Sequence, residues 1–320
     1  MDHIFITGAT GLIGSRVVQT LTERGMKPAC LVRPNSDTST ISSASLVHGD
    51  LLDPASLLDG MHGASQVIHL AAVADWRNIN KPVVWKTIVE GTRNVLTAAR
   101  ETGVRRVVHI SSSAAIDGTL QPRLLDETST FSLPRKGFLY AHAKREAESI
   151  CQQFQLEGLP VVIVNPAETY GPKDHRLTTA GNLLRFAKGR TAWVTRGGTG
   201  VVHADDVAAG ILLALEHGHP GQRYILSAEN LTFASIARFV RETLCRPCNI
   251  MEAPAAVVRI LAALERTLRL PLGLNPDMIP YATRYWFMDS QKARQHLGWR
   301  PRPGSEAITE TTRWLQETHL

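Results

Sequence analysis

Near the start of the chain, Ile4-Phe5-Ile6-Thr7 runs directly into Gly8-Ala9-Thr10-Gly11-Leu12-Ile13-Gly14. The first four residues have the composition of a buried strand, and apolar residues then recur at three- and four-residue spacing, which predicts a helix over 13–24. A strand, a glycine turn and a helix in this order are typical of a dinucleotide site. We expect Gly8 to form the tight turn, Gly11 to admit the diphosphate and Gly14 to let the helix pack on the strand. Thr10, Leu12 and Ile13 belong to the same turn, where unpaired helix amides attract phosphate.

The alternation of strand and helix continues through the first two thirds of the chain. It predicts an α/β fold, a doubly wound parallel Rossmann sheet. The predicted strands are 3–7, 28–32, 66–70, 106–111 and 161–165, and the later helices are 54–61, 84–101 and 140–156. Gly25, Gly103 and Gly158 directly follow three of the predicted helices, where a left-handed residue is favoured as the C-cap.

After Gly171-Pro172 the alternation becomes irregular, which indicates a smaller mixed C-terminal lobe for the substrate. We expect residues 1–172 to form the dinucleotide-binding domain, with 200–228 returning to it, and 173–199 and 229–320 to form the lobe. A helix is predicted over 177–188, a strand over 223–226 and a helix over 233–244. The stretch 255–272 is the most apolar of the chain, but four charged residues interrupt it, so a membrane span is not expected. A packed amphipathic helix is favoured over an interfacial helix or a lid above an apolar substrate.

The composition is that of an ordinary globular protein, with 43% apolar residues and a formal charge of +6. Lys and Arg form no continuous run, which favours a phosphate pocket and a solvated surface over a nucleic-acid interface. The four cysteines include Cys245 and Cys248 as a lone CxxC with no second ligand pair, so free thiols in a reducing cytoplasm are expected and a metal site is not. The first residues lack the features of a secretion signal, so export is not expected.

The end of the second predicted strand bears on the choice of cofactor. An acidic residue there would bind the adenosine ribose diol, whereas a guanidinium would bind a 2′-phosphate. The residue here is Arg33, and no acidic residue precedes Asp37. Because arginine can bond a phosphate through two N–H groups, the sequence favours NADP(H) over NAD(H). The alternative is that Arg33 is only a solvated charge at a strand end.

A candidate catalytic set follows the fourth of these strands. Ser111-Ser112-Ser113 lies at the strand end, and Tyr140 and Lys144 stand four residues apart on a predicted helix, hence on one face. A neighbouring ammonium lowers the pKa of a phenol, which would let Tyr140 exchange a proton with a substrate oxygen. We expect Ser113 to bind that oxygen and Lys144 also to reach the nicotinamide ribose. Ser112 is the alternative to Ser113.

Taken together, these motifs make the chain resemble the extended short-chain dehydrogenase/reductases over nearly its whole length. The resemblance implies that Asp50 and Leu51 lie against adenine, that the backbone of Leu70, Ala71 and Ala72 lines the cofactor, and that Pro166 begins a PxxxYGP element beside the nicotinamide. The segments 202–207 and 293–301 also match family signatures. Relatives often dimerise through the helices expected at 84–101 and 140–156, which suggests a homodimer.

Two residues depart from the family pattern. Glu90 stands where an Asn is usual, so any role of that amide is missing or moved. Glu168 stands inside the PxxxYGP element, where an apolar residue or Asn is commoner. Its carboxylate could bind or deprotonate substrate, although a salt bridge to a nearby base is the simpler expectation.

The resemblance covers several reactions. Arg33 and the absence of an Asp-Glu pair after Ser113 favour the dihydroflavonol reductase and 3β-hydroxysteroid dehydrogenase branch, which implies NADP(H)-dependent reduction of a ketone or aldehyde with an apolar body. The alternative is a nucleotide-sugar epimerase or dehydratase with tightly bound NAD(P), for which Arg176, Arg185, Arg190 and Arg196 could bind a diphosphate. A non-catalytic NADP-binding sensor is a second alternative, disfavoured because both Tyr140 and Lys144 are present.

Overall fold

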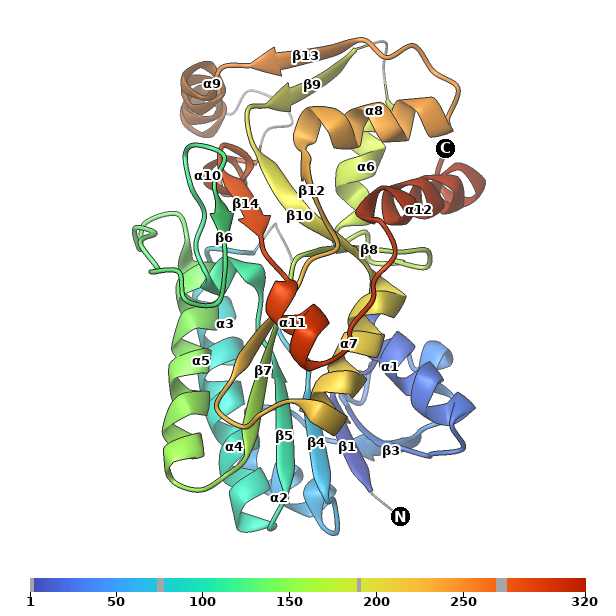
Figure 1. Ribbon diagram of the computed structural model, residues 1–320, viewed down its shortest axis with the longest axis vertical. Coiled ribbons are helices and arrows are strands. Elements are labelled where there is room, and N and C mark those ends of the chain that lie inside the picture. The colour runs from blue at the N-terminus through green and yellow to red at the C-terminus, as the bar shows by residue number, and fades with distance from the viewer. Residues whose placement is uncertain (1–2, 74–77, 189–190, 269–274) are drawn as a thin grey trace.

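The computed structural model describes residues 3–73, 78–188, 191–268 and 275–320. Its main element is a seven-stranded parallel sheet with the strand order β11-β7-β5-β4-β1-β2-β3 (Figure 1). The strands are β1 (Ile4–Thr7), β2 (Ala29–Val32), β3 (Ser45–His48), β4 (Gln66–His69), β5 (Arg106–Ile110), β7 (Val161–Pro166) and β11 (Arg223–Leu226). Since all seven run the same way, their carboxyl ends lie along one edge of the sheet, where doubly wound folds bind ligands.

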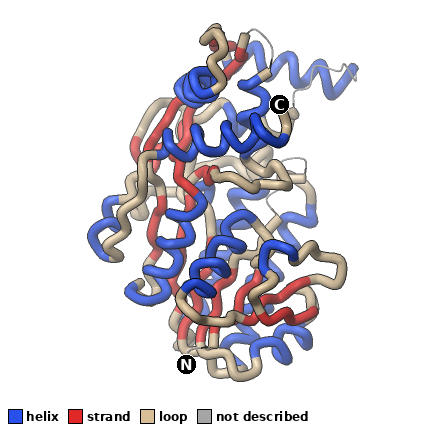
Figure 2. The backbone as a smooth tube through the Cα atoms, turned by 90° about the vertical axis from the view of Figure 1, so that its right-hand side faces the viewer, coloured by secondary structure: helices blue, strands red, loops and turns tan. Residues whose placement is uncertain are grey.

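Helices cover both faces of this sheet, and Figure 2 shows its strands between two helical layers. One face is covered by α1 (Leu12–Glu23), α7 (Ala204–His217) and α11 (Gln291–His296). The other is covered by α2 (Pro54–Met61), α3 (Pro82–Trp85), the π-helical turn η2 (Lys86–Glu90), α4 (Gly91–Glu101) and α5 (Leu139–Leu156). The central strands are buried on both faces, which accounts for their continuous β-branched composition.

The C-terminal lobe contains two smaller sheets. One has the order β12-β10-β14-β6, with β8 also paired to β10, and the other pairs β13 with β9. The strands are β6 (Leu124–Leu125), β8 (Glu168–Tyr170), β9 (Ala192–Thr195), β10 (Gly198–His203), β12 (Glu229–Thr232), β13 (Ile250–Ala253) and β14 (Tyr285–Met288). The helices are α6 (Ala180–Ala187), α8 (Phe233–Thr243), α9 (Ala255–Leu268), α10 (Ile279–Ala282) and α12 (Gly304–Thr318), besides the short 3-10 turns η1 (Ser39–Ile41) and η3 (Ser113–Ala115).

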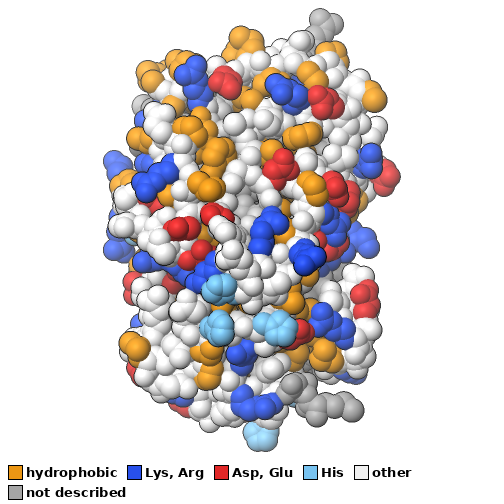
Figure 3. Space-filling view, in the orientation of Figure 1, with side chains coloured by type: hydrophobic (Ala, Val, Ile, Leu, Met, Phe, Trp, Pro, Cys, Tyr) orange, Lys and Arg blue, Asp and Glu red, His pale blue; other side chains and the backbone are white. Residues whose placement is uncertain are grey.

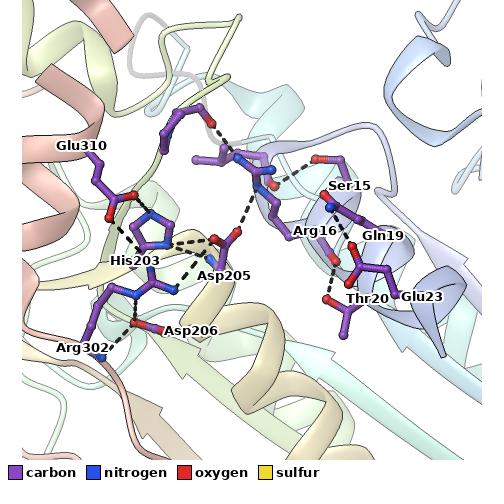
Figure 4. Close-up of polar contacts among 12 residues, drawn as sticks. Ser15, Arg16, Gln19, Thr20, Glu23, His203, Asp205, Asp206, Arg302 and Glu310 are labelled. Atoms are coloured by element: carbon purple, nitrogen blue, oxygen red, sulfur yellow. Dashed lines mark hydrogen bonds and ion pairs between the residues drawn. The ribbon is translucent and has the colours of Figure 1, made fainter. Parts of the chain in front are cut away.

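An ion network joins the glycine-turn helix α1 to the C-terminal part of the chain (Figure 4). Arg16 on α1 pairs with Asp205 at the start of α7, with 3.1 Å between Nε and Oδ1. Arg302 pairs with the neighbouring Asp206 at 3.1 Å and with Glu310 on α12 at 3.6 Å. The two adjacent aspartates therefore fix the position of α1 relative to the lobe, which gives the segment 202–207 a structural role.

Most predicted elements are confirmed to within a residue or two. Gly25, Gly103 and Gly158 have the expected positive φ values of 77°, 72° and 98°. The predicted helix over 84–101 is wrong in detail, because it begins at Pro82 and its central turn is π-helical. Within the segment 200–228, β10 belongs to the five-stranded sheet and β11 belongs to the main sheet.

Two further features concern the cysteines and the membrane. The cysteines are free thiols, with Cys30 and Cys151 buried and Cys245 and Cys248 exposed. Within the described residues, no helix combines the length and the apolar character that crossing a bilayer requires.

Trp299 is the buried residue that secures the C-terminal segment to α7. Its side chain is 1% exposed and its indole Nε1 donates to the carbonyl of Asp206 at 2.8 Å. We predict that Trp299→Ala lowers the free energy of unfolding by about 3–5 kcal/mol, since it leaves a cavity and an unpaired carbonyl. The control is Trp193→Ala, which removes a 63% exposed ring and is expected to change stability by less than about 0.5 kcal/mol. Urea unfolding measures both, and equal losses would contradict this role for Trp299.

Candidate active site

In the glycine turn between β1 and α1, the backbone at two glycines lies so close to neighbouring backbone that no side chain would fit there. A Cβ on Gly8, whose φ is +78°, would lie 2.6 Å from the amide nitrogen of Ala71, and one on Gly14 would lie 2.2 Å from the carbonyl oxygen of Gly8. Gly11 has no such neighbour, since its nearest atom would be 3.4 Å away. Only Gly8 and Gly14 are therefore required by the fold itself, and Gly11 leaves an open approach to the turn.

The N-terminus of α1 suits an anion. Its N-cap, Gly11, supplies no side-chain hydrogen bond, and the first turn carries no acidic residue. The first amides of the helix are thus left for an external acceptor, and the helix dipole favours negative charge there. The residues present fit the diphosphate of a nicotinamide dinucleotide. Thr10, Leu12 and Ile13 are partly exposed at the same place.

The remaining predicted cofactor residues lie along the carboxyl edge of the sheet. Arg33 follows β2 and is exposed, and its guanidinium has no ion-pair or hydrogen-bond partner in the described ranges. Asp50 and Leu51 follow β3, where Asp50 Oδ1 accepts from the amide of Leu52. The residues after β4 are Leu70, Ala71 and Ala72, all partly buried, and Pro166 ends β7. The structure brings these residues to one edge, as the sequence predicts.

His69 anchors the loop that contains Leu70 to Ala72. Its Nδ1 is 2.7 Å from the hydroxyl of Thr7 on β1, and its Nε2 is 3.1 Å from that of Thr92 on α4. The Thr7 hydroxyl also accepts from the amide of Ala71 at 3.3 Å. Burial lowers the pKa of His69 to about 3, so the ring is neutral and can accept from one hydroxyl. The loop is thereby held against the glycine turn.

Tyr140 and Lys144 lie on the face of α5 that meets the ends of β5 and β7, as predicted. Lys144 is 3% exposed, and its Nζ donates to the carbonyl of Ile110 at 2.8 Å. Burial lowers the pKa of this ammonium to about 8, opposed by the charge of Glu148. The expected effect on Tyr140 is wrong in direction: burial raises the pKa of its phenol, opposed by a hydrogen bond to Ser112. The Lys144 ammonium is turned toward the strand end and is not among the groups that shift the pKa of Tyr140.

The serines at the end of β5 have different surroundings. The Ser112 hydroxyl contacts the Tyr140 phenol and accepts from the amide of Ala114 at 3.2 Å. Ser113 is the first residue of η3, is 8% exposed, and its hydroxyl has no hydrogen-bond partner among the described residues. Ser112 therefore lies beside Tyr140, and the Ser113 hydroxyl is available to an external group, so the choice of Ser113 over Ser112 as the contact of the substrate oxygen stays a prediction.

A buried network that the sequence reasoning missed holds this serine turn. Asn165 on β7 donates through Nδ2 to the carbonyl of Ser112 at 3.0 Å and to Glu148 at 2.5 Å. Glu148 is 1% exposed and also pairs with Arg223 on β11 at 3.1 Å. Glu148 lies four residues beyond Lys144, so its place on the catalytic face of α5 could have been read from the spacing. The network ties α5, β7 and the serine turn together.

Aromatic residues of the lobe pack beside Tyr140. Tyr281 on α10 stacks on Trp286 of β14 with ring centroids 5.4 Å apart, and its ring lies 4.9 Å from that of Phe138. Tyr140 packs against this cluster, which also includes Ala141. The wall of the site next to the phenol is therefore mainly apolar. Its sequence signal was weak, because Tyr281 and Trp286 lie far along the chain in the irregular lobe.

The structure shows the surroundings of Glu90 and Glu168, the two residues that depart from the family pattern. Glu90 ends the π-helical turn and is exposed, so it does not replace a buried amide. Glu168 accepts from the Tyr170 phenol at 2.7 Å and from Asn182 at 3.0 Å. The expected salt bridge to a base is wrong, since both partners are neutral. Burial raises the pKa of the Glu168 carboxyl, opposed by these hydrogen bonds.

Comparison with known proteins shows the family of the chain. The model of the NAD dependent epimerase/dehydratase family matches residues 4–227. The chain belongs to that family. It is 31% identical to sterol demethylase protein B of Methylococcus capsulatus, over 98% of both chains. It is 30% identical to a putative dihydroflavonol 4-reductase of Synechocystis sp., over 98% of this chain and 95% of that one.

The fold of the epimerase/dehydratase family extends over the whole molecule. The crystal structure of gox2253 superposes with a TM-score of 0.85 at 32% identity, covering 100% of this chain and 99% of the other. The predicted resemblance to the extended short-chain dehydrogenase/reductases is confirmed. Members of this family bind a nicotinamide dinucleotide.

We predict that the second and third glycines of the turn have separable roles. In Gly11→Ala the new Cβ meets no close protein atom but occupies the approach to the turn, so dinucleotide affinity should fall by about tenfold or more while stability changes by less than about 0.5 kcal/mol. In Gly14→Ala the Cβ strikes backbone, so stability should fall by about 1–3 kcal/mol. Calorimetric titration and thermal unfolding measure the two effects, and a Gly11→Ala chain with native affinity would contradict the assignment.

Proposed function

We propose that this chain is an NADP(H)-dependent reductase that reversibly converts a ketone or aldehyde to an alcohol. The observation that carries the proposal is the position of Tyr140, whose ring packs on the aromatic cluster of the lobe while its hydroxyl meets Ser112. An apolar wall beside a proton donor fits a carbonyl group on an apolar body. The relative named as a reductase over nearly its whole length supports the same class of reaction.

In the proposed mechanism, the reduced nicotinamide supplies hydride to the carbonyl carbon. Tyr140 donates its phenolic proton to the carbonyl oxygen, so that the alcohol is released without a free alkoxide. Ser113 donates a hydrogen bond to the same oxygen and fixes its position. Lys144, whose pKa of about 8 leaves it mostly protonated at neutral pH, stabilises the phenolate that remains and binds the nicotinamide ribose. The reverse reaction runs through the same groups.

The raised pKa of Tyr140 suits the reductive direction. A phenol that keeps its proton at neutral pH is ready to act as an acid. Ser112 opposes the shift and so adjusts the acidity of the phenol. We propose that Ser112 positions Tyr140 and that Ser113 contacts the substrate.

The proposed substrate lobe consists of residues 173–199 and 229–320, which supply Tyr281 and Trp286 to the apolar wall. The free thiols are consistent with the cytoplasm as the proposed compartment. The helices α4 and α5 are the proposed contact of a homodimer.

A nucleotide-sugar epimerase with bound NAD(P) is the second candidate, favoured by the family model itself. Four arginines were expected to serve its diphosphate. Arg176 reaches the Thr10 hydroxyl of the glycine turn at 3.5 Å, and Arg196 pairs with Glu252 at 3.3 Å. Arg185 is exposed on α6, and Arg190 lies outside the described residues. Assaying NADPH oxidation with a panel of carbonyl compounds and, in parallel, inversion of UDP-sugars distinguishes the two candidates.

We predict that Tyr140→Phe lowers kcat by about 10²–10⁴-fold with dinucleotide affinity unchanged, because only the proton donor is lost.

Ser113→Ala should lower kcat by about 10²-fold through loss of the hydrogen bond to the reacting oxygen. Ser112→Ala is the matched comparison. This substitution removes the Ser112 hydroxyl, whose hydrogen bond lowers the pKa of Tyr140. The pKa of Tyr140 should therefore rise, and the alkaline limb of the pH-rate profile should move to higher pH. If Ser112→Ala lost more activity than Ser113→Ala, the two serine roles would be exchanged.

We predict that Arg33→Ala raises the KM for NADPH by about tenfold or more and leaves that for NADH nearly unchanged, because a charge-assisted pair with the 2′-phosphate is lost. Arg24→Ala removes an exposed arginine that pairs with Glu216 and is the control, with neither KM altered. Initial rates with both cofactors measure the effect. A native enzyme that prefers NADH would refute the NADP(H) assignment.

A further inference from the structure

Helix α9 turns an apolar stripe toward solvent. Its residues Val257, Ile260, Leu261 and Leu264 follow one another at the spacing of one helical face, and they are 46%, 60%, 39% and 40% exposed. Val258, which lies about 100° round the helix from Val257, is buried against Ile279 of α10. The helix is therefore attached to the lobe by one side and presents its apolar side outward. The sequence predicts a packed amphipathic helix over 255–272, and the side of α9 that carries Val258 is packed in this way, whereas the apolar stripe is not. Residues 269–272 lie outside the described part of the chain.

The neighbouring sheet extends this apolar surface. Trp193 on β9 and Met251 on β13 are paired residues of adjacent strands, and their side chains are 63% and 51% exposed. Figure 1 places β9, β13 and α9 together at the upper end of the molecule, and Figure 3 shows hydrophobic side chains there together with basic and some acidic ones. An exposed tryptophan next to an outward apolar helix is typical of surfaces that enter the headgroup region of a bilayer.

The positive charge of the chain is concentrated at the same end. The described residues of these segments, 185–188, 191–196 and 233–268, contain eight Lys and Arg against three Glu, whereas the whole chain contains 35 Lys and Arg against 29 Asp and Glu. The rest of the chain therefore has 27 basic and 26 acidic residues and is close to neutral. This differs from the even spread expected from the sequence, because segments far apart in the chain meet in the lobe. The exposed basic residues there are Arg185, Lys188, Arg196, Arg238, Arg246 and Arg259.

The acidic side chains of this end do not cancel its charge. Glu252 is already paired with Arg196 at 3.3 Å, and Glu242 is exposed on α8. Basic residues beside an apolar face attract anionic lipid, and each one near the surface strengthens the attraction. A second copy of the chain would place two positive ends against each other, which opposes self-association through this face.

We propose that this end of the lobe, formed by α9, β9 and β13, is a docking surface for an anionic phospholipid bilayer. The stripe of α9 and Trp193 enter the interfacial region, and the surrounding arginines and Lys188 contact lipid phosphates. The molecule rests on the membrane without crossing it. The proposal is independent of the reaction, since it depends only on the outer face of the lobe.

The test is flotation of the purified full-length chain with vesicles of phosphatidylcholine mixed with phosphatidylglycerol, compared with vesicles of phosphatidylcholine alone. We predict binding to the anionic vesicles that weakens as salt is raised, and a blue shift of tryptophan emission that Trp193→Phe reduces. The double substitution Ile260→Ser and Leu264→Ser should weaken binding by about tenfold or more, because buried apolar area is lost without a change of charge. The control is Leu156→Ser, which removes an 89% exposed leucine from the end of α5 and should bind as the native chain does.

Three outcomes would overturn the proposal. One is the absence of co-flotation with anionic vesicles at low salt. Another is equal binding by the native chain and the double variant, which would show that the charge attracts any polyanion and the stripe does not insert. The last is a native dimer, detected by light scattering, that the double variant converts to a monomer, since the stripe would then be a contact between copies. Circular dichroism of each variant confirms that the fold is retained.

Discussion

The close approach of backbone at Gly8 and Gly14 is the constraint on which the rest of the structure depends. Without a side chain at Gly8, the turn after β1 packs directly on the loop after β4, and without one at Gly14, α1 packs directly on that turn. The first amides of α1 therefore lie at the carboxyl edge of the sheet. Hydrogen bonds between Thr7 and His69 and between Thr7 and the amide of Ala71 hold the loop after β4 in place. The same edge receives the ends of β5 and β7, so one parallel sheet places both the proposed anion site and the proposed catalytic side chains.

A buried polar network is the second feature that positions side chains at this edge of the sheet. Glu148 and Asn165 are buried polar groups that satisfy each other and the carbonyl of Ser112, so the serine turn cannot shift without leaving them unpaired. On the other side, aromatic residues of the lobe close the wall next to Tyr140. Burial raises the pKa of the phenol and lowers the pKa of the Lys144 ammonium to about 8, which leaves this ammonium mostly protonated at neutral pH.

The main sheet could be predicted because its strands are continuous apolar runs bounded by glycines, and periodicity reports such patterns directly. The edge strand β3 was not predicted, since Ser45 and His48 interrupt its apolar character and two of its residues are exposed. The lobe strands pair segments such as 198–203 and 285–288, whose partnership no local pattern reveals. Tyr140 and Lys144 were found by spacing, but the direction of the Tyr140 pKa depends on the depth of burial, which the sequence does not give.

The central claim is that hydride from the bound dinucleotide reaches the carbonyl carbon of a separate substrate. The most direct test is to incubate the native protein with NADPH deuterated at C4 of the nicotinamide and a panel of apolar ketones and aldehydes, and to analyse the products by mass spectrometry. The account predicts an alcohol that carries deuterium at the carbinol carbon, formed together with an equal amount of oxidised cofactor. It is contradicted if no compound acquires the label while a nucleotide sugar is inverted with no net consumption of cofactor.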